Sequence, residues 1–570
     1  MVVLLGGLLV LATWFAVTVI VVSWGLVFTH VGRRSHGPVT LNDLATAAWW
    51  GLAAAALAGI VLAFFVPLGS TAAMVVLLAI SAVAIIASGR FILRAGVSRP
   101  RWSPVTIALL AAFILAWFYL ALAALGPVTH YDAGLYQWAA VQYALDYRVI
   151  PGLANLYGPL GYGGAEPILG ALLGTAAWHG EGFRLLGGLF LALLGLQALV
   201  RLLIKPRSAG TAVLLAGAAL IYPPMLWMAD FWVTSPTPDL PVLVLAVVAA
   251  SYLADLATGS NSGPRGTSAA TLPTIVVLAA LMTALRPTAA LLALALVLAA
   301  IAATLVRRES ISGVSLGISA AVAIALGLAV IARDRMLSGW LQYPASLLAF
   351  EVPWRAPDPE PLRTATLGFA RDPDNWQQAA SSVDWLGPWF ARLPQQWEPW
   401  WLVAALALAA VLLIAPGASP RRGRPLLLTA APYALAAIAW LWFSPPAFRF
   451  GWGPLFGIAS VLLGWALWRR SLQTPFVLLV AVGVTAVALA GSLVRLDWTA
   501  ERERRSIIGI PVEVVPVQPA PTTEFTTDSG INLRVPVESD QCWSNYPLCT
   551  PTPNPALEFL GDDLAEGFVS

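Results

Sequence analysis

Charged residues are scarce in this sequence. Only 11% of its 570 residues are Asp, Glu, Lys or Arg, and 59% are hydrophobic. Soluble domains carry about 25% charged residues, so a water-soluble protein of this size could not bury so much apolar surface. The net charge is only +3, which gives no electrostatic support to a nucleic-acid partner.

Several motifs are also missing. The sequence has no phosphate-binding loop and no dinucleotide fingerprint, so cytosolic nucleotide chemistry is unsupported. His130 and His179 show no metal-ligand spacing. The apolar stretches lack the alternating pattern of transmembrane β-strands. These absences leave helices in a membrane as the predicted architecture.

Long apolar stretches recur from end to end, each close to the ~20 residues that cross a ~30 Å hydrocarbon layer as a helix. They predict an all-α polytopic membrane protein. The first stretch lacks a basic n-region and a clear cleavage site, so it reads as a retained span. The candidate spans, roughly fourteen in number, are 2–29, 43–67, 72–90, 103–125, 182–203, 211–229, 237–257, 272–286, 288–306, 312–332, 397–416, 425–444, 450–468 and 475–495.

Basic residues follow the odd-numbered spans, which predicts that those loops are cytoplasmic. Both termini and the connections 126–181 and 333–396 would then be extracytoplasmic. The apolar segment Ala165 to Trp178 must be re-entrant or interfacial, because a full crossing would break the alternation. The residues behind this prediction are Arg33, Arg34, Arg90, Arg94, Arg99, Arg101, Lys205, Arg207, Arg265, Arg307, Arg308, Arg421, Arg422, Arg424, Arg469 and Arg470.

The tail, residues 497–570, contains the only two cysteines, Cys542 and Cys549. In an oxidising compartment they could close a small disulfide loop, and the alternative is two unpaired thiols. Pro511 to Pro521 reads as an extended linker. The aromatic residues beyond it favour packing on the outer face.

Asp132 lies where span 4 leaves the membrane, and an amphipathic stretch to Tyr147 follows it. That stretch predicts a helix lying in the interface. Asp132 could cap this helix, or it could bind a divalent ion or act as a general base. The glycine-rich connection 149–164 permits close approach of the backbone to a ligand.

Other charged residues lie at the same predicted face. Arg286 lies in an otherwise apolar stretch, where charge is costly; the alternatives are a site cation, snorkelling, or pairing with Asp239. Asp239 begins span 7, either as a helix-dipole charge or as part of a site. Arg449 is a candidate cation or a span-end anchor, and Glu166 is a second acidic candidate.

A membrane-emergent acid followed by an interfacial helix resembles the GT-C superfamily of multi-span glycosyltransferases. Tyr131-Asp132-x-Gly134-Leu135-Tyr136 with Val149-Ile150-Pro151-Gly152-Leu153-x-Asn155-Leu156 is more closely similar to a group of large bacterial membrane proteins with GT-C-like architecture. That group usually has His where Gln137 stands and His-Gly-Arg where Tyr157-Gly158-Pro159 stands. The resemblance also includes Ser235 to Pro241, Ser338-Gly339, Tyr343-Pro344, Arg449-Phe450, Asp540 to Trp543 and Cys549-Thr550-Pro551.

The resemblance implies a GT-C-like core at 101–496, with additional N-terminal helices at 1–100 and an extracytoplasmic tail at 497–570. It implies transfer of a hexose or pentose from a polyprenyl-phosphate donor to an envelope polysaccharide or glycolipid, at the outer face of a bacterial cytoplasmic membrane. Asp132 would be the base or a carboxylate beside Mg²⁺ or Mn²⁺. The expected substrate-binding residues are Tyr131, Tyr136, Gln137, Asn155, Glu166, Asp239, Arg286, Tyr343 and Arg449.

Two other functions remain open at this point. A transporter or flippase of envelope lipid or polysaccharide should show polar residues near mid-span and paired halves. The polar residues here gather at one face and no internal repeat is evident, which favours the enzyme. A non-catalytic GT-C-like scaffold is the third hypothesis, based on the departures at Gln137 and Pro159.

Overall fold

Long apolar helices form most of the protein. The computed structural model describes residues 2–31, 38–96, 102–204, 208–259, 271–415 and 423–570. In these ranges, twelve helices are long and apolar enough to span a membrane. They include α1 (Val2–Val31), α2 (Leu41–Ala63), α3 (Thr71–Ala95), α4 (Pro104–Ala123), α8 (Leu186–Ile204), α9 (Ala209–Trp227), α10 (Asp239–Thr258), α12 (Ala290–Arg307), α13 (Gly313–Ser338), α17 (Trp397–Ile414), α19 (Phe448–Arg469) and α20 (Gln473–Val494).

Two further apolar helices are shorter. They are α11 (Thr271–Leu285) and the Leu428–Phe443 part of α18 (Gly423–Phe443). Each of the predicted spans coincides with one of the fourteen helices, twelve long and two short. The prediction of a polytopic helical membrane protein is therefore confirmed, and within the described part of the chain α11, with 15 residues, is shorter than a full crossing requires.

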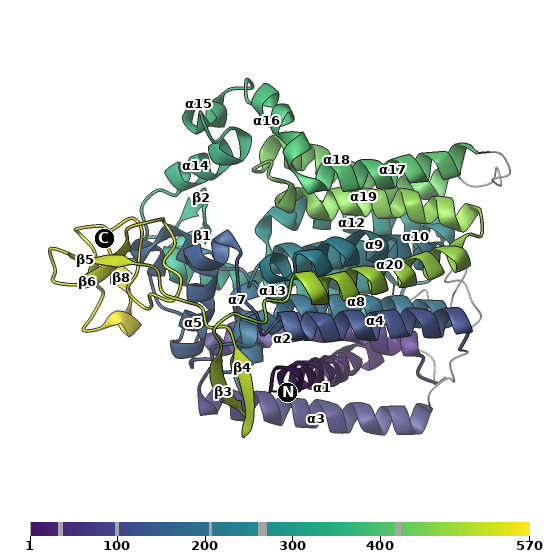
Figure 1. Ribbon diagram of the computed structural model, residues 1–570, viewed down its shortest axis with the longest axis horizontal. Helices are drawn as coiled ribbons and strands as arrows, with labels where there is room; N and C mark the ends of the chain where they lie inside the picture. Colours follow the sequence, from purple (N-terminus) through teal and green to yellow (C-terminus); the bar gives the residue numbers. More distant parts are fainter. Residues whose placement is uncertain (1, 32–37, 97–101, 205–207, 260–270, 416–422) are drawn as a thin grey trace.

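The helices form one bundle with α10 at its centre (Figure 1). The apolar window of α10 is completely buried, and α8, α9, α11, α12, α18 and α19 all contact it. At the periphery, α3 and α17 expose most of their apolar surface. Exposed Leu, Ile and Val side chains on outer helices are expected when the surrounding solvent is hydrocarbon.

Small residues allow close packing between α1 and α2. A Cβ added at Gly25 would lie 1.8 Å from the carbonyl oxygen of Ala47, and one at Gly51 would lie 1.7 Å from that of Val21. Such backbone approach between helices is typical of membrane proteins, where apolar burial does not drive association.

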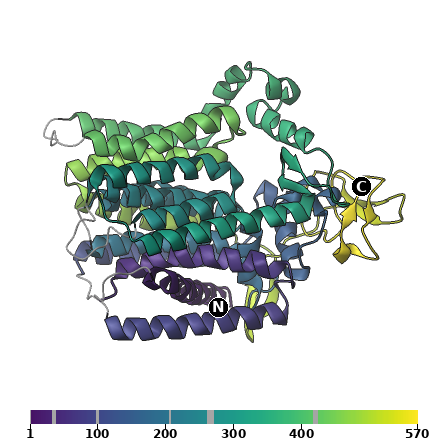
Figure 2. The same cartoon turned by 180° about the vertical axis from the view of Figure 1, so that it is seen from behind.

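One end of the bundle is covered by the segments 126–181, 333–396 and 497–570, and we call it the capped end (Figures 1 and 2). Both chain ends lie there: Gly6, near the start of α1, packs against Leu125 and Val512. The first two segments form η1 (Ala133–Gln137), α5 (Trp138–Asp146), α6 (Leu153–Leu156), η2 (Gly158–Gly161), α7 (Glu166–Gly174), β1 (Trp340–Gln342), β2 (Ala345–Ala349), α14 (Glu360–Arg371), α15 (Trp376–Ser381) and α16 (Leu386–Arg392).

Two local predictions about chain reversals are confirmed. Helix α7 has nine residues, so it rises only about 14 Å and cannot cross the hydrocarbon layer. Helix α11 ends at Leu285, and the 3₁₀ turn η6 (Pro287–Ala289) separates it from α12. Pro287 lacks an N–H and therefore suits the start of the new helix.

The tail folds into antiparallel β-hairpins, which the helix-based prediction missed. The pairs are β3 (Glu503–Ile507) with β4 (Ile510–Val514), β5 (Thr522–Thr526) with β6 (Asn532–Pro536), and β7 (Glu558–Phe559) with β8 (Phe568–Val569). The predicted linker is thus wrong at its start, because residues up to Val514 pair with β3. Cys542 and Cys549 form a disulfide, with Cα atoms 5.9 Å apart.

Basic residues gather at the end opposite the capped end. Arg307, at the end of α12, donates to the carbonyl oxygen of Thr258 at 3.2 Å. Arg470, just after α19, donates to the carbonyl oxygens of Leu412 and Ala415. Arg33, Arg34, Arg99, Arg101, Lys205, Arg207, Arg265, Arg421 and Arg422 lie outside the described residues.

Candidate functional site

Asp132 lies beyond the end of α4 and directly before the π-helical turn η1. Its backbone is already helical, and its side chain makes no capping bond to that turn. Its Oδ2 instead accepts from Nη1 of Arg449 at 2.9 Å. The interpretation of Asp132 as a helix cap is therefore wrong, since its carboxylate is used for an ion pair.

A second ion pair lies close to the first. Arg286, from the break between α11 and α12, pairs with Asp239 at the start of α10. The guanidinium carbon of Arg286 lies 4.7 Å from the ring centre of Phe450, and that of Arg449 lies 5.0 Å from it. The Phe450 ring thus lies beside both guanidiniums, and each guanidinium is paired with a carboxylate. We call these four charged residues the ionic cluster: Asp132, Asp239, Arg286 and Arg449.

His130 forms a hydrogen bond with the backbone of Asp132. Its Nδ1 accepts from the backbone N–H of Asp132 at 3.2 Å, and the rings of Phe231 and Trp232 lie 4.7 and 4.9 Å from its own. Burial lowers the pKa of His130 to about 4, although nearby Asp132 opposes this shift. The imidazole is therefore neutral near pH 7, and the positive charge beside Asp132 comes from arginine.

Three tyrosines form a row that begins near the ionic cluster. The rings of Tyr136 and Tyr162 lie 5.4 Å apart, edge to face, and those of Tyr162 and Tyr343 lie 6.1 Å apart. We call these three the tyrosine row. Burial raises the pKa of all three, and the charge of Asp132 raises the pKa of Tyr136 and Tyr162 further. Their hydroxyls are therefore neutral and able to donate as well as accept.

Glu166 is the first residue of α7 and is 3% exposed. Burial raises the pKa of its carboxyl well above the usual range, although Arg333 and Arg286 act in the opposite direction. Its Oε1 has no hydrogen-bond partner within the described part of the chain. The neutral acid is therefore favoured, and it can donate a hydrogen bond inside the capped end.

Two of the expected substrate-binding residues have other surroundings. The amide of Asn155 donates to the carbonyl oxygens of Trp354 and Phe568 and accepts from the Ser570 hydroxyl. These bonds tie the glycine-rich connection to the end of the tail. Gln137, the last residue of η1, is 1% exposed and therefore buried.

The tail covers the outer edge of the site. The Tyr131 hydroxyl donates to Asp540, and the Gln541 amide donates to the carbonyl oxygen of Tyr131 at 2.8 Å. The backbone N–H of Trp543 donates to the carbonyl oxygen of Gly134 at 2.8 Å. The sequence placed the tail on the outer face, but nothing in it showed that residues 540–543 lie on the Asp132 segment.

A substitution at Gly134 tests whether the tail packs on the Asp132 segment. A Cβ at this position would lie 2.4 Å from Cε2 of Trp543. We expect Gly134→Val to displace Trp543 and to destabilise the tail by about 1–3 kcal/mol, the usual cost of overpacking. Limited trypsin cleavage at Arg534 should become faster. Gly387→Val, at a position of α16 with open space around it and no positive φ, is the control for a larger side chain at the capped end, and equal cleavage in wild type and Gly134→Val would contradict the prediction.

The surroundings of Asp132 do not fit Mg²⁺ or Mn²⁺. Such ions prefer several carboxylate or carbonyl oxygens, whereas the nearest partner of Asp132 is the cationic Arg449. Among the described residues, no group of three or more His, Cys, Asp or Glu side chains could hold a metal ion. Arg449 and Arg286 are the groups available here to receive negative charge.

A further ion pair escaped the sequence analysis. Arg201 of α8 pairs with Asp255 of α10, and both side chains are almost fully buried. The Asp255 carboxylate also accepts from the backbone N–H of Gly210 at 2.8 Å. The sequence signal that could have revealed this pair is Asp255 itself, a carboxylate in an otherwise apolar span. Both residues lie within a turn of the C-terminal ends of their helices. Together with the bond to Gly210, the ion pair holds α8, α9 and α10 together.

Comparison with known proteins places the chain in a family. A family model described as "Domain of unknown function (DUF8201)" matches residues 8–456. The match begins in α1 and ends in α19, so it includes the first three helices and the whole ionic cluster. A search of curated proteins finds no match.

Proposed function

The chain belongs to the DUF8201 family, and because that description assigns no activity, we propose one from the site. The protein transfers a sugar from a polyprenyl-phosphate-linked donor to a cell-envelope acceptor at the capped end. The observation that carries this proposal is the ionic cluster, in which Asp132 lies 2.9 Å from Arg449 and a second arginine faces the same phenylalanine ring.

The reaction needs a base and a receiver of negative charge. The acceptor hydroxyl attacks the anomeric carbon while the bond from that carbon to the phosphate oxygen breaks, with inversion. The hydroxyl proton goes to the carboxylate of Asp132, and the departing polyprenyl phosphate leaves beside Arg449 and Arg286. Guanidinium groups suit phosphate oxygens because their N–H groups form a planar fork.

Access to the cluster is consistent with this chemistry. The Arg449 side chain is 27% exposed and that of Asp132 is 11% exposed, so both can be reached from the outer side. The Arg286 side chain is 11% exposed, the same fraction as that of Asp132, and it lies at the break between α11 and α12. The polyprenyl chain would remain in the hydrocarbon layer beside the bundle, since each apolar CH₂ withdrawn from water gains about 0.8 kcal/mol.

The placement of charges argues against transport. A transporter is expected to bind its substrate near the middle of the bilayer, at broken helices. Here the ionic cluster lies at the helix ends of the capped end, and Arg201 with Asp255 lies near the opposite ends.

A direct assay tests the proposal. The purified full chain in nanodiscs would be incubated with synthetic polyprenyl-phosphate hexoses and pentoses, with and without a panel of oligosaccharide acceptors, and the polyprenyl phosphate released by transfer or by hydrolysis would be measured. We expect time-dependent release from at least one donor. The control is the same panel with short, water-soluble alkyl phosphates, which should react more slowly. Binding of a donor without any release would favour the scaffold, and neither binding nor release would contradict the proposal.

We also propose that the capped end is extracytoplasmic in a bacterial cytoplasmic membrane, because the short loops at the other end are rich in basic residues, whereas arginines of the capped end such as Arg184, Arg449 and Arg495 are paired with carboxylates. In intact cells, a membrane-impermeant maleimide should label Asp562→Cys in the tail and should not label Ser310→Cys between α12 and α13. Both positions are exposed, and the native cysteines are paired with each other. The reverse labelling pattern would overturn this orientation.

A further inference from the structure

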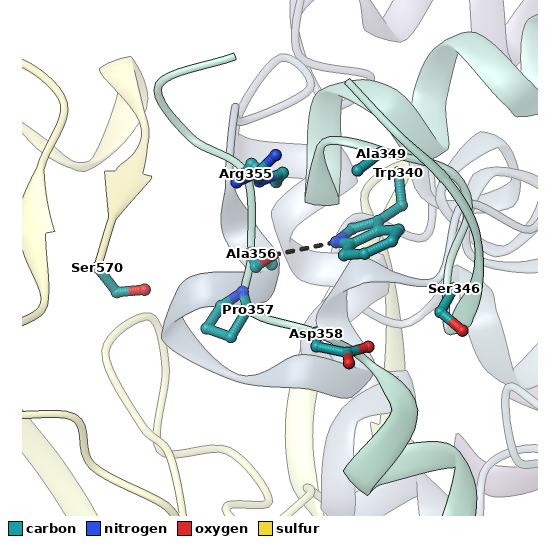
Figure 3. Close-up of a pocket in the computed structure, with 8 residues that line it drawn as sticks. All are labelled: Trp340, Ser346, Ala349, Arg355, Ala356, Pro357, Asp358 and Ser570. Carbon is teal, nitrogen blue, oxygen red and sulfur yellow. Dashed lines mark hydrogen bonds between the residues drawn. The ribbon is translucent and has the colours of Figure 1, made fainter. Parts of the chain in front are cut away.

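A hollow of about 590 Å³ lies at the capped end, beside the β1–β2 hairpin (Figure 3). Its size falls within the roughly 300–1,000 Å³ of small-molecule sites. The lining combines an indole ring with polar groups from separate parts of the chain. The residues are Trp340, Ser346, Ala349, Arg355, Ala356, Pro357, Asp358 and Ser570.

The polar groups of the hollow are held in place by bonds to their neighbours. The Trp340 Nε1–H donates to the carbonyl oxygen of Ala356 at 3.0 Å, which fixes the ring against the wall (Figure 3). Asp358 Oδ1 accepts from the backbone N–H of Glu360 at 3.0 Å. Arg355 pairs with Glu351 at 3.1 Å. A lining fixed in this way loses little freedom when a ligand binds.

The chemistry of the lining selects the class of ligand. Arg355 is paired with Glu351, and Asp358 also lines the hollow, so an anionic headgroup would find no excess positive charge. Four of the eight lining residues are polar or charged, so an isoprenoid chain would leave them unpaired, which is costly. A ring that is apolar on one face and rich in hydroxyls at its edge matches both the indole and the polar groups.

Packed aromatic side chains connect the wall of the hollow with the surroundings of the ionic cluster. Trp340, Ala356 and Tyr343 pack in one cluster with Tyr162. The tyrosine row then leads from Tyr343 through Tyr162 to Tyr136, whose pKa responds to the charge of Asp132. Tyr136 and Tyr162 are only partly buried, so a chain of sugar units that lies over them would lead from the hollow towards Asp132.

We propose that the hollow binds a saccharide unit of the acceptor, and that the acceptor is therefore an oligosaccharide or polysaccharide chain. This inference rests on the proposed transferase function, because it assigns the second substrate of that reaction. The terminal hydroxyl of the chain lies at Asp132, while a preceding unit stacks on Trp340 near Asp358 and Arg355.

Glycan binding tests the inference without requiring turnover. The purified full chain in nanodiscs would be applied to an array of linear gluco-, manno-, galacto- and arabino-oligosaccharides, and the affinity for the best oligosaccharide would then be measured by calorimetry. We expect Trp340→Leu to weaken binding about tenfold, because the apolar volume remains but the aromatic face is lost. Trp340→Phe should restore most of the affinity.

Matched variants separate binding from folding. Asp358→Asn keeps an oxygen for the Glu360 N–H but removes the charge at the exposed rim, and it should also weaken binding severalfold. Asp384→Asn is the control, because Asp384 is an exposed carboxylate of the capped end that does not line the hollow. The affinity of this control should stay within about twofold of that of the wild type. This is a much smaller change than the tenfold loss expected for Trp340→Leu, which corresponds to about 1.4 kcal/mol.

The outcomes are distinguishable. Release of polyprenyl phosphate from a donor together with no binding on the array would overturn the saccharide inference and leave the transferase proposal standing. Binding that is weakened by Trp340→Leu, without any donor release, would support the saccharide site and contradict the transferase proposal. Binding that is unchanged by both Trp340→Leu and Asp358→Asn, or that is displaced by phosphatidylglycerol vesicles, would overturn the saccharide inference.

Discussion

Asp132→Asn should lower the rate of sugar transfer by roughly 10²–10⁴-fold, the usual contribution of a general base. Asn has nearly the same shape as Asp but cannot accept the hydroxyl proton. Arg449 loses its partner, yet its side chain is 27% exposed, so water can solvate it and the fold should persist. The measurement is the single-turnover rate of polyprenyl-phosphate release, with thermal unfolding measured on the same preparation.

The matched control is Asp230→Asn. Asp230 also lies at the capped end, where it pairs with Arg495 at 3.2 Å and accepts from the Thr129 hydroxyl. It does not belong to the ionic cluster, so its removal should change the rate by about twofold at most, because a partly exposed ion pair contributes at most about 1 kcal/mol. A rate that survives Asp132→Asn unchanged would exclude the role assigned to Asp132.

Asp239→Ala should destabilise the protein by about 3–5 kcal/mol, the usual cost of breaking a buried ion pair. The Asp239 side chain is fully buried and that of Arg286 is 11% exposed. Removing the carboxylate leaves the guanidinium without its partner and also removes the bond from the Thr237 hydroxyl at 2.7 Å. Thermal unfolding in detergent, followed by size-exclusion chromatography after heating, would measure the loss.

A double substitution shows whether the cost comes from the unpaired charge. Replacing both partners of a buried pair by apolar residues is often neutral or stabilising. Asp239→Ala combined with Arg286→Leu should therefore recover much of the stability lost in the single variant, while transfer activity stays low. If the double variant were as unstable as the sum of the two single variants, the unpaired charge would not be the cause.

Hydropathy predicted most of the fold because each span is a local property of about 20 residues. The pairing of Arg286 with Asp239 was also accessible, since an arginine in an apolar stretch needs a nearby carboxylate. The pairing of Asp132 with Arg449 was not, because it depends on how α19 packs in the bundle. Its Phe450 neighbour, which both arginines share, carries no charge signal at all.

The structure of the tail was harder to predict for a different reason. Its strands have at most five residues, too few for alternation to distinguish them from a Pro-rich linker. Contacts such as that between Trp543 and Gly134 join segments that are remote in sequence, and only the folded chain brings them together. The hollow at Trp340 is likewise built from β1, the loop before α14 and the last residue of the chain.

The cover over the Asp132 segment has a consequence for biogenesis. The hydrogen bond from Tyr131 to Asp540 joins residues 409 positions apart, and all the spans lie N-terminal to Asp540. Ribosomes make the chain from its N-terminus, so α1 and α2 can associate early, whereas residues 540–543 arrive after every helix has been inserted. The cover over the Asp132 segment can therefore form only after all the spanning helices have been synthesised, which makes it one of the last contacts of the folding chain.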